Sequence, residues 1–210
     1  MLHRTTRLDS TAGGFISDRT VINGADMGRQ RTIDREQVLD AAERVVVREG
    51  AANLTLEAVG IEAGISKASV LYDYKTKKAL IRTLVERRVK AEEEQVQRAT
   101  DAQSDRPNAR IRGVIAASTR SFSDEERAVG LNLCAALAQD EDVRGPVQKS
   151  LQTIIADIQQ SSANPRGAML AFLAIQGLVL LDWFGLHRFS QAERDRFIAE
   201  IDWLIEQSPP

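Results

Sequence analysis

Residues 54–80, LTLEAVGIEAGISKASVLYDYKTKKAL, form the stretch that decides the fold. Thr55 and Ser66 each precede a short helical pattern, and a hydroxyl at that place accepts a hydrogen bond from the first turn of a helix. The corner between the two helices is Ala63-Gly64-Ile65, in which Gly64 tolerates a positive φ. Two short helices joined by a tight turn that contains glycine are typical of a helix-turn-helix, so the stretch predicts one.

The exposed face of the second short helix carries candidate contacts with DNA. Lys67, Ser69 and Tyr72 lie on that face of the predicted helix. The second helix of a helix-turn-helix enters the major groove with its N-terminal half, where a lysine and a hydroxyl can reach base edges and phosphates. The stretch therefore predicts binding to double-stranded DNA.

The charges along the chain agree with a DNA-binding front part. Residues 29–90 contain 13 Lys and Arg against 9 Asp and Glu, whereas residues 91–210 contain 12 against 18. A basic front and an acidic back are typical of a nucleic-acid module joined to a domain with another partner. We predict a disordered extension over residues 1–30, a DNA-binding domain over 31–78 and a helical domain over 79–210.

Most of the remaining chain also has a helical pattern. Apolar residues recur at helical spacing, and no segment alternates with period two for long enough to form a strand. Ser123 with Glu126 and Ser190 with Glu193 predict capping boxes, and Gly145-Pro146 predicts either a break or the start of a helix. The chain is therefore predicted to be all-α, with about nine helices.

The composition argues against several classes of site. One cysteine and two histidines can form neither an internal disulfide nor a zinc site of His and Cys ligands. The sequence has no glycine-rich phosphate loop, nucleophile elbow or paired histidines, so we expect neither an enzyme nor a cofactor. Residues 168–186 approach the length of a membrane span but contain Gln176 and Asp182, so we predict the core helix of a soluble, cytoplasmic protein.

The helix-turn-helix stretch resembles the TetR family of bacterial transcriptional regulators. The residues that carry the resemblance are Thr55, Val59, the corner Ala63-Gly64-Ile65-Ser66, Tyr74, Lys77 and Leu80. The preceding VLDAAERVVVREG is similar to the first helix of the family. The resemblance covers residues 33–85 closely, and beyond them it consists of the all-helical architecture alone.

Several positions depart from the family pattern. The family usually has alanine at the position of Gly60, glycine at that of Ala68 and tyrosine at that of Leu71. Its usual phenylalanine falls on Tyr74. These departures are compatible with the fold, but they change which aromatic hydroxyl would contact a phosphate. We expect Tyr72 to make that contact and Tyr74 to pack against the first helix.

The resemblance implies further contacts with DNA. In this family the helix that here begins near Thr76 points its N-terminus at the DNA backbone, where a phosphate can accept its N–H groups. A basic arm before the first helix would add Arg31. The predicted DNA-binding residues are Arg31, Thr55, Ser66, Lys67, Ala68, Ser69, Tyr72, Lys75 and Lys77.

The resemblance also implies what the rest of the chain does. Members of this family are homodimers that clasp operator DNA and release it when a small molecule binds the larger domain. Their last two helices form a bundle across the dimer axis, and residues 168–181 are too apolar to face water. The predicted effector pocket is an apolar set that favours an apolar or aromatic effector. Its residues are Leu133, Cys134, Leu137, Phe172, Gln176 and Trp183.

We therefore predict a transcriptional regulator, a repressor that a small-molecule effector releases from its operator. The alternative belongs to another class: a helical interaction protein that keeps the helix-turn-helix as a scaffold without specific DNA binding. The departures at Ala68 and Leu71 leave this alternative open. Salt-dependent binding to duplex DNA separates the two.

Overall fold

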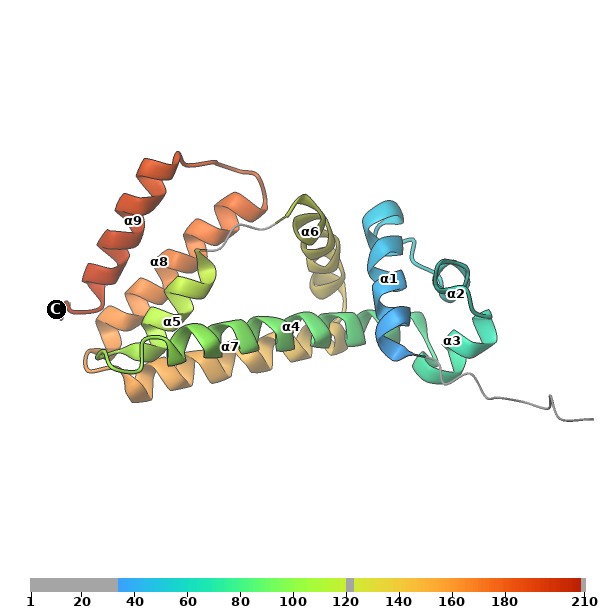
Figure 1. Ribbon diagram of the computed structural model, residues 1–210, viewed down its shortest axis with the longest axis horizontal. Helices are drawn as coiled ribbons and strands as arrows, with labels where there is room; N and C mark the ends of the chain where they lie inside the picture. Colours follow the sequence, from blue (N-terminus) through green and yellow to red (C-terminus); the bar gives the residue numbers. More distant parts are fainter. Residues whose placement is uncertain (1–33, 120–122, 209–210) are drawn as a thin grey trace, which may run out of the picture. The chain divides into compact units, whose positions relative to one another are not determined.

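The computed structural model describes residues 34–119 and 123–208, and within them all regular structure is helical. The all-α prediction is therefore confirmed for the described residues, whereas the predicted extension over residues 1–30 and Arg31 lie outside them. The helices, which belong to one compact unit, are drawn in Figure 1. They are α1 (Arg35–Glu49), α2 (Leu56–Ala63), α3 (Lys67–Tyr74), α4 (Lys77–Asp101), α5 (Ala109–Ser118), α6 (Asp124–Gln139), α7 (Glu141–Ser161), α8 (Pro165–Trp183) and α9 (Gln191–Leu204).

Side-chain caps fix where the early helices begin. The hydroxyls of Thr55, Ser66 and Thr76 precede α2, α3 and α4, and each accepts a hydrogen bond of 3.0 Å from the backbone N–H three residues later. Such a cap satisfies one N–H that the helix leaves without a partner, and losing it costs about 1 kcal/mol. Gly64 ends α2 with a φ of 69°, so the predicted left-handed turn is confirmed.

The later helix boundaries agree with the sequence in two places and differ in a third. The capping boxes of Ser123 and Ser190 are both present. The break predicted at Gly145-Pro146 is wrong, because α7 begins at Glu141 and continues through Pro146. Asp140 caps α7 by accepting the N–H of Asp142 at 2.9 Å. The proline lies in the second turn, where its missing N–H leaves one carbonyl near the exposed helix start without its partner.

A first hydrophobic core lies where α1 to α4 meet α6 and the start of α7. Its buried side chains come mostly from the helices of the helix-turn-helix, and Leu54, Leu80 and Leu84 are fully buried. Val129 and Leu133 of α6 belong to the same cluster. The core that holds the helix-turn-helix together therefore includes residues from the second half of the chain.

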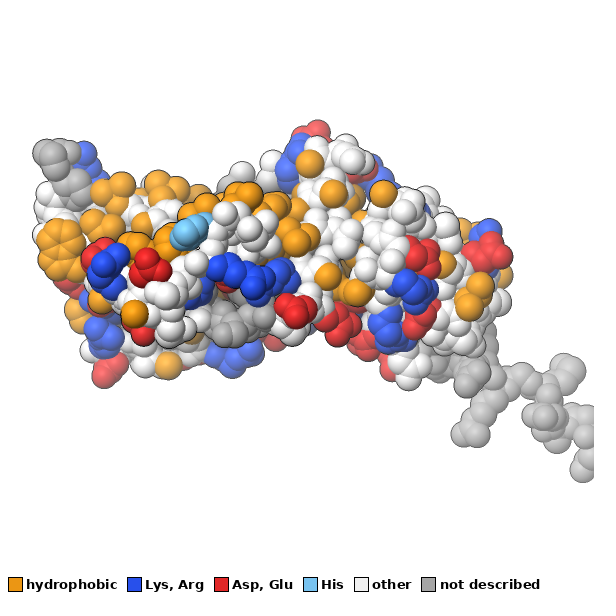
Figure 2. Space-filling view, turned by 90° about the horizontal axis from the view of Figure 1, so that it is seen from above, with side chains coloured by type: hydrophobic (Ala, Val, Ile, Leu, Met, Phe, Trp, Pro, Cys, Tyr) orange, Lys and Arg blue, Asp and Glu red, His pale blue; other side chains and the backbone are white. Residues whose placement is uncertain are grey.

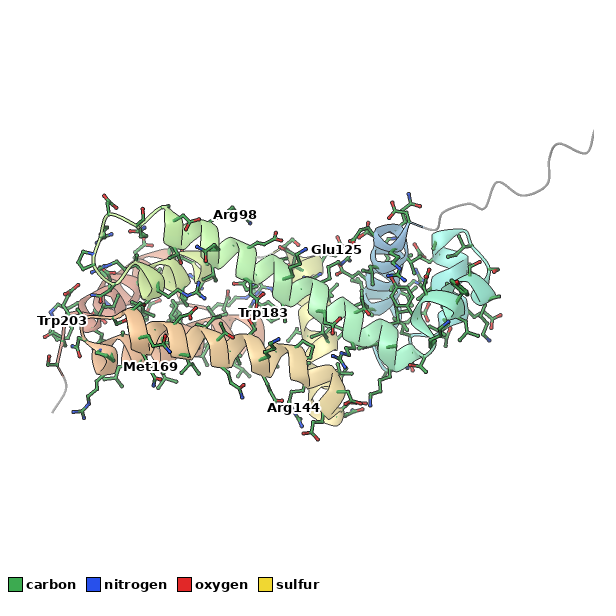
Figure 3. All side chains as sticks on the ribbon, turned by 90° about the horizontal axis from the view of Figure 1, so that it is seen from below. Arg98, Glu125, Arg144, Met169, Trp183 and Trp203 are labelled. Atoms are coloured by element: carbon green, nitrogen blue, oxygen red, sulfur yellow. The ribbon has the colours of Figure 1, made fainter. Side chains whose placement is uncertain are left out.

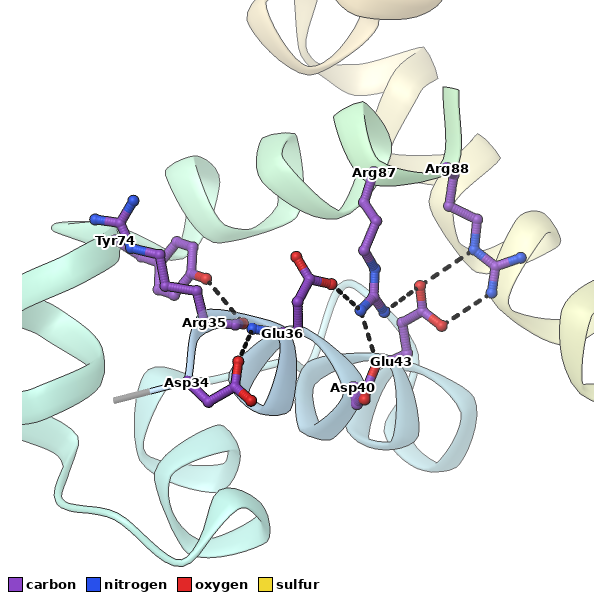
Figure 4. A network of polar contacts seen from close by, with 8 residues as sticks. All are labelled: Asp34, Arg35, Glu36, Asp40, Glu43, Tyr74, Arg87 and Arg88. Atoms are coloured by element: carbon purple, nitrogen blue, oxygen red, sulfur yellow. Dashed lines mark hydrogen bonds and ion pairs between the residues drawn. The ribbon is translucent and has the colours of Figure 1, made fainter. Parts of the chain in front are cut away.

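Ion pairs on the surface join α4 to α1 in addition to this core. The Arg87 guanidinium lies 2.7 Å from the Asp40 carboxylate and 2.8 Å from that of Glu43. Arg88 contacts the same Glu43 at 3.0 Å, as Figure 4 shows. Burial acts to lower the pKa of Arg87, but the hydrogen bonds that its guanidinium donates to Glu43 and Asp40 outweigh burial and raise that pKa. A charge shared among several partners fixes α1 on α4 more firmly than an isolated surface pair would.

A second hydrophobic core joins the far end of α4 with α5, α7, α8 and α9. Its fully buried members include Ile111, Ile158 and Ile205. The α8 helix buries one side here and is, by length and composition alone, apolar enough to cross a membrane. Only a third of the most apolar 18-residue stretch of α8 is buried, so much of this helix remains exposed.

The α4 helix takes part in both cores. Its first half places Leu80 and Leu84 in the first core, and its second half places Val96 in the second. The backbone of Gly113 in α5 lies so close to α4 that a Cβ there would stand 2.2 Å from the Thr100 hydroxyl. The predicted domain boundary at residue 78 falls in the first turn of this helix, and no gap in the fold coincides with it.

Candidate nucleic-acid interface

The helix-turn-helix depends on a close contact at its corner. A Cβ on Gly60 of α2 would lie 3.0 Å from the Ile65 carbonyl oxygen and 3.2 Å from the Lys67 nitrogen. The corner therefore leaves little room at Gly60, the position where the resembled family usually has alanine. Val59 and Val70 are fully buried beneath it. These contacts hold α3 against α2 with one of its faces outward.

The outward face of α3 is formed by Lys67, Ala68, Leu71 and Tyr72, which are all exposed. Leu71 is 45% exposed and Tyr72 is 74% exposed, although both side chains carry large apolar surfaces. On the opposite side, Val70 and Tyr74 are buried in the first core. We call these four outward residues the α3 outer face.

Tyr74 packs against the first helix, as the sequence predicted. Its side chain is 6% exposed, and its hydroxyl donates a hydrogen bond of 3.4 Å to the Arg35 carbonyl of α1. Burial raises the pKa of Tyr74, so the hydroxyl stays protonated and available as a donor. Of the two tyrosines, only Tyr72 is placed where another molecule could reach its ring.

The hydroxyls predicted to contact DNA also have structural roles. Ser66 and Ser69 lie with their Oγ atoms 2.8 Å apart, and Ser66 caps α3 as described. Thr55 caps α2 in the same way. All three hydroxyls lie near the N-terminal ends of α2 and α3, so a phosphate that approached these ends would meet hydroxyls and free backbone N–H groups together.

Three neighbouring lysines take three different directions. The Lys75 ammonium lies over the ring of Tyr72, 4.7 Å from its centroid. Lys77 donates to the carbonyl oxygen of Ala52 in the loop after α1 and is only partly exposed. Lys78 pairs with the carboxylates of Asp140 and Asp142 at the junction of α6 and α7. The sequence predicted DNA contacts from Lys75 and Lys77, but of these three lysines only Lys75 lies against a residue of the α3 outer face.

Lys75 holds a strained backbone conformation at the end of α3. Its φ is 54° and its ψ is −41°, a combination that residues other than glycine rarely adopt. Its backbone N–H donates a hydrogen bond of 2.9 Å to the Leu71 carbonyl, and this bond closes the last turn of α3. This turn places the lysine ammonium above Tyr72.

Two acidic residues beside the α3 outer face form ion pairs with basic side chains. The Asp73 carboxylate lies 3.3 Å from the Arg35 guanidinium of α1, and its side chain is only 11% exposed. Glu57 of α2 lies 3.4 Å from the ammonium of Lys67, and both of these side chains are more than half exposed. An exposed pair of this kind is weak, so Lys67 is free to exchange Glu57 for a phosphate.

The residues predicted to line an effector pocket come from both hydrophobic cores and from partly buried positions beside them. Leu133 and Leu137 pack in or against the first core, whereas Phe172 belongs to the second. Cys134 is half-buried, and burial raises the pKa of its thiol. Gln176 is also only partly buried. The predicted pocket therefore remains a prediction.

Trp183 connects α8 with α6. A Cβ on Gly130 of α6 would stand 2.1 Å from the Trp183 ring, so the glycine leaves the space that the indole fills. Trp183 lies between the helices, whereas Trp203 lies at the edge of the array (Figure 3). The sequence could not show this pairing, because the two residues are far apart in the chain.

A groove of about 640 Å³ lies between α8 and α9, and it contains none of the six predicted pocket residues. Its lining is almost wholly apolar. The lining residues are Ala174, Gly177, Leu178, Leu181, Phe189, Phe197, Glu200, Ile201, Trp203 and Leu204.

An exposed apolar stripe continues from this groove along α8. Leu170, Leu173, Gly177, Leu180 and Phe184 recur at intervals of three and four residues and so share one face of the helix. The four large side chains are 44–60% exposed. We call these five residues the α8 stripe. In Figure 2 hydrophobic side chains gather over the end of the molecule that carries α8 and α9.

Comparison with known families gives two matches on this chain. Residues 38–84 match the family described as bacterial regulatory proteins, tetR family. Residues 108–206 match the family described as tetracyclin repressor-like, C-terminal domain. A comparison with curated proteins found no match.

Several solved structures share the fold. A transcriptional regulator from Streptomyces coelicolor A3(2) is 16% identical, with a TM-score of 0.67 over 82% of this chain and 98% of that one. The multidrug binding protein EbrR, solved with imidazole, is 18% identical, with a TM-score of 0.64 over 83% and 96%. A transcriptional regulator from Saccharomonospora viridis, solved with choline, is 18% identical, with a TM-score of 0.61 over 82% and 95%. At these identities the likeness is one of fold.

Proposed function

Because the chain belongs to the tetR family of bacterial regulatory proteins, we propose that it is a cytoplasmic transcriptional repressor that a small molecule releases from its operator. The observation that carries the proposal is the α3 outer face. It exposes Leu71 and Tyr72 on a helix held rigidly by the first core, with Lys67 and Lys75 beside them. Exposed apolar groups between positive charges favour a partner that has both phosphates and flat or apolar surfaces, as the major groove has.

In this proposal the contacts with the DNA backbone come from both sides of α3. Lys67 moves from Glu57 to a phosphate, and the ring and hydroxyl of Tyr72, with Lys75 above it, approach a second one. The first turn of α4, which Thr76 caps, offers free N–H groups to a third. Lys77 acts indirectly, because its ammonium holds the loop after α1 in place.

We propose that two copies of the chain associate through α8 and α9. The α8 stripe and the neighbouring Trp203, which is 60% exposed, would otherwise leave a large apolar area in water. A two-fold dimer would place two copies of α3 on successive turns of one face of the DNA, as a palindromic operator requires.

We propose that the effector is a small, largely apolar or aromatic molecule that binds among the helices beyond α4. The support is the apolar character of the predicted pocket residues and the contact of Trp183 with α6. EbrR is a multidrug binding protein that was solved with imidazole and with ethidium, which shows that this fold can accommodate aromatic molecules. The α6 helix also supplies Val129 and Leu133 to the first core, so a shift of α6 would reach the helix-turn-helix.

The test is selection of bound fragments from genomic DNA with the purified full-length chain, followed by affinity measurements at several salt concentrations. We expect the affinity to fall steeply as salt rises, because phosphate contacts release counterions. Lys67→Ala and Lys75→Ala should each lower the slope of the logarithmic salt dependence by about 1. Lys149→Ala, which removes an exposed lysine of α7, is the matched control and should leave the slope unchanged.

The same measurements separate the alternatives. If the selection yields no DNA fragments and the affinity of the chain for duplex DNA does not depend on salt, the chain is a helical interaction protein instead. If fragments are recovered, the genes beside them supply candidate effectors. A molecule that lowers the affinity for the recovered fragment, and relieves inhibition of transcription from it in a purified system, would support repression with release.

A further inference from the structure

The α3 helix has few of the side chains that identify guanine and adenine by paired hydrogen bonds. Arginine or lysine typically binds guanine in this way, and asparagine or glutamine binds adenine. Within α3, all eight residues of which the structure describes, the sequence KASVLYDY contains no arginine, asparagine or glutamine, and Lys67 is its one lysine. Apart from Lys67, the helix must therefore distinguish bases by other means.

The polar groups of α3 that remain are mostly engaged elsewhere. The Ser69 hydroxyl contacts that of Ser66 at 2.8 Å, and Asp73 is held by Arg35 with only 11% of its side chain exposed. Lys67 carries a mobile point charge that suits a phosphate. Tyr72 carries the Lys75 ammonium over its ring and lies toward the end of the helix. The two remaining side chains of the α3 outer face, those of Ala68 and Leu71, are wholly apolar and exposed.

Ala68 and Leu71 stand where a recognition helix meets base edges. Ala68 is the second residue of α3, and Leu71 follows three positions later on the same face. Leu71 is 45% exposed, so much of its apolar surface has no partner among the residues that the structure describes. In the major groove the one apolar group that a base pair presents is the 5-methyl group of thymine.

We propose that α3 recognises its operator chiefly through the 5-methyl groups of thymines, which Ala68 and Leu71 contact in the major groove. This inference rests on the proposed function and specifies its DNA target. Each half-site contains one or two thymines whose methyl groups are buried against these side chains. Lys67, Tyr72 and Lys75 position α3 on the phosphates and contribute little to the choice of base.

The experiment replaces thymines by deoxyuridine, which pairs identically and lacks only the methyl group. The site is first obtained by selection with the full-length chain from random duplex DNA. Each thymine of the selected half-site is then replaced singly, and the affinity is measured at fixed salt. We expect about fourfold weaker binding at one or two thymines, the loss that corresponds to one buried methyl group. Thymines outside the half-site should show no change.

Protein variants assign the effect to the two side chains. Leu71→Ala and Ala68→Gly should each bind the unmodified site more weakly, and each should lose most of its sensitivity to deoxyuridine at one position. Ile61→Ala, which shortens an exposed apolar side chain of α2, is the matched control and should keep the fourfold loss. Circular dichroism confirms that the variants are folded, which we expect because none of the three side chains is buried.

Two results would overturn the inference while leaving DNA binding intact. One is a selected site at which no thymine responds to deoxyuridine, and the other is an unchanged response in both Leu71→Ala and Ala68→Gly. The second result would assign the methyl effect to DNA stiffness or to another part of the protein. A chain that selects no DNA at all would instead contradict the regulator function, and with it the mode of recognition.

Discussion

The two hydrophobic cores differ in how completely the chain covers them. In the first, large side chains such as Leu54, Leu80 and Leu84 are fully buried, and its outer surface is crossed by the ion pairs of Arg87 and Arg88. In the second, α8 buries one side and leaves the α8 stripe exposed. The first core is complete within one chain, whereas the second keeps an apolar surface that we assign to a second copy.

The difference agrees with the partner that we propose for each end of the chain. DNA is polar and highly charged, so the helix-turn-helix needs a rigid internal core and only a small exposed apolar face. A protein partner of the same sequence can cover a long apolar stripe, so α8 can be apolar on all sides. The following predictions test this contrast, from the largest expected effect to the smallest.

Truncating a fully buried side chain of the first core should cause the largest loss of stability. We expect Leu84→Ala to lower the free energy of unfolding by about 2–5 kcal/mol, because it removes apolar contacts and leaves a cavity. The measurement is urea unfolding followed by circular dichroism at one protein concentration. Leu151→Ala in α7, where the leucine is 40% exposed, is the control and should cost less than about 1 kcal/mol. Equal losses in the two variants would contradict a closed first core.

A charge in the middle of the α8 stripe should prevent association. We expect Leu173→Glu to weaken the dimer at least about 30-fold, since a residue buried at the centre of an interface would contribute more than about 2 kcal/mol. Sedimentation velocity over a range of concentrations measures the change, and the affinity for the selected DNA should fall with it. Leu151→Glu places the same charge on an exposed leucine of α7 and should sediment like the unmodified chain. A dimeric Leu173→Glu protein would exclude the α8 stripe as the interface.

Arg112 provides the polar anchor of the second core and gives an intermediate effect. It is 8% exposed and contacts the carboxylates of Asp202 on α9 and of Glu206 just after it, as well as the Pro107 carbonyl at 3.1 Å. We expect Arg112→Met to lower the free energy of unfolding by about 1.5–3 kcal/mol, the usual contribution of hydrogen bonds to a charged group.

The matched control for Arg112 lies on α9 itself. Arg196 pairs with Glu200 one turn away, and both side chains are more than 60% exposed. Arg196→Met should therefore change the unfolding midpoint in urea very little. If Arg112→Met proved as stable as Arg196→Met, α9 would be held by its apolar contacts alone.

The pairing of Lys78 with Asp140 and Asp142 should have the smallest effect, and one that depends on pH. The hydrogen bonds that Lys78 donates to Asp142 and Asp140 raise the pKa of Lys78, and the same contact lowers the pKa of Asp140. The lowered pKa of Asp140 gives stability that is present above its ordinary value of 3.8 and is lost as the pH falls through the folded value. The raised pKa of Lys78 gives stability that is present below 10.5 and is lost as the pH rises through the folded value.

The prediction is therefore a difference in Tm that is confined to a range of pH. Lys78→Met should lower the Tm by less than about 3 °C at neutral pH, because the pair is exposed to solvent. The difference should disappear in acid, once Asp140 is protonated. Differential scanning calorimetry at several pH values measures it, with Lys149→Met as the control. A difference that persists at acid pH would mean that Lys78 acts through packing of its side chain.

Local signals in the sequence predicted much of the fold. The caps at Thr55, Ser66 and Ser123 and the left-handed Gly64 were predictable, because each depends on residues within a few positions of one another. The prediction at Pro146 was wrong because Asp140 is a stronger cap. It starts α7 at Glu141, five residues before the proline. A proline close behind such a start removes little hydrogen bonding, and the sequence alone does not show which of the two signals prevails.

The candidate site was less predictable, because its geometry depends on distant pairs. The sequence predicted DNA contacts from both Lys75 and Lys77, but the partner of Lys75 lies in α3 and that of Lys77 in the loop after α1. The exposure of Leu71 was equally hidden, since helical periodicity alone does not show whether a partly apolar helix turns a leucine toward the core. Its importance depends on which faces of α3 the first core occupies.

The continuity of α4 limits how this protein can be rebuilt. Regulators are often recombined by joining the DNA-binding end of one protein to the sensing end of another, and residue 78 would be an obvious place to join them. In this chain such a junction separates Leu80 and Leu84 from the core that needs them, and it leaves Val129 and Leu133 facing a foreign helix. A functional hybrid would have to exchange α1 to α4 together with the facing residues of α6. The helix-turn-helix is therefore not separable from the rest of the chain at residue 78.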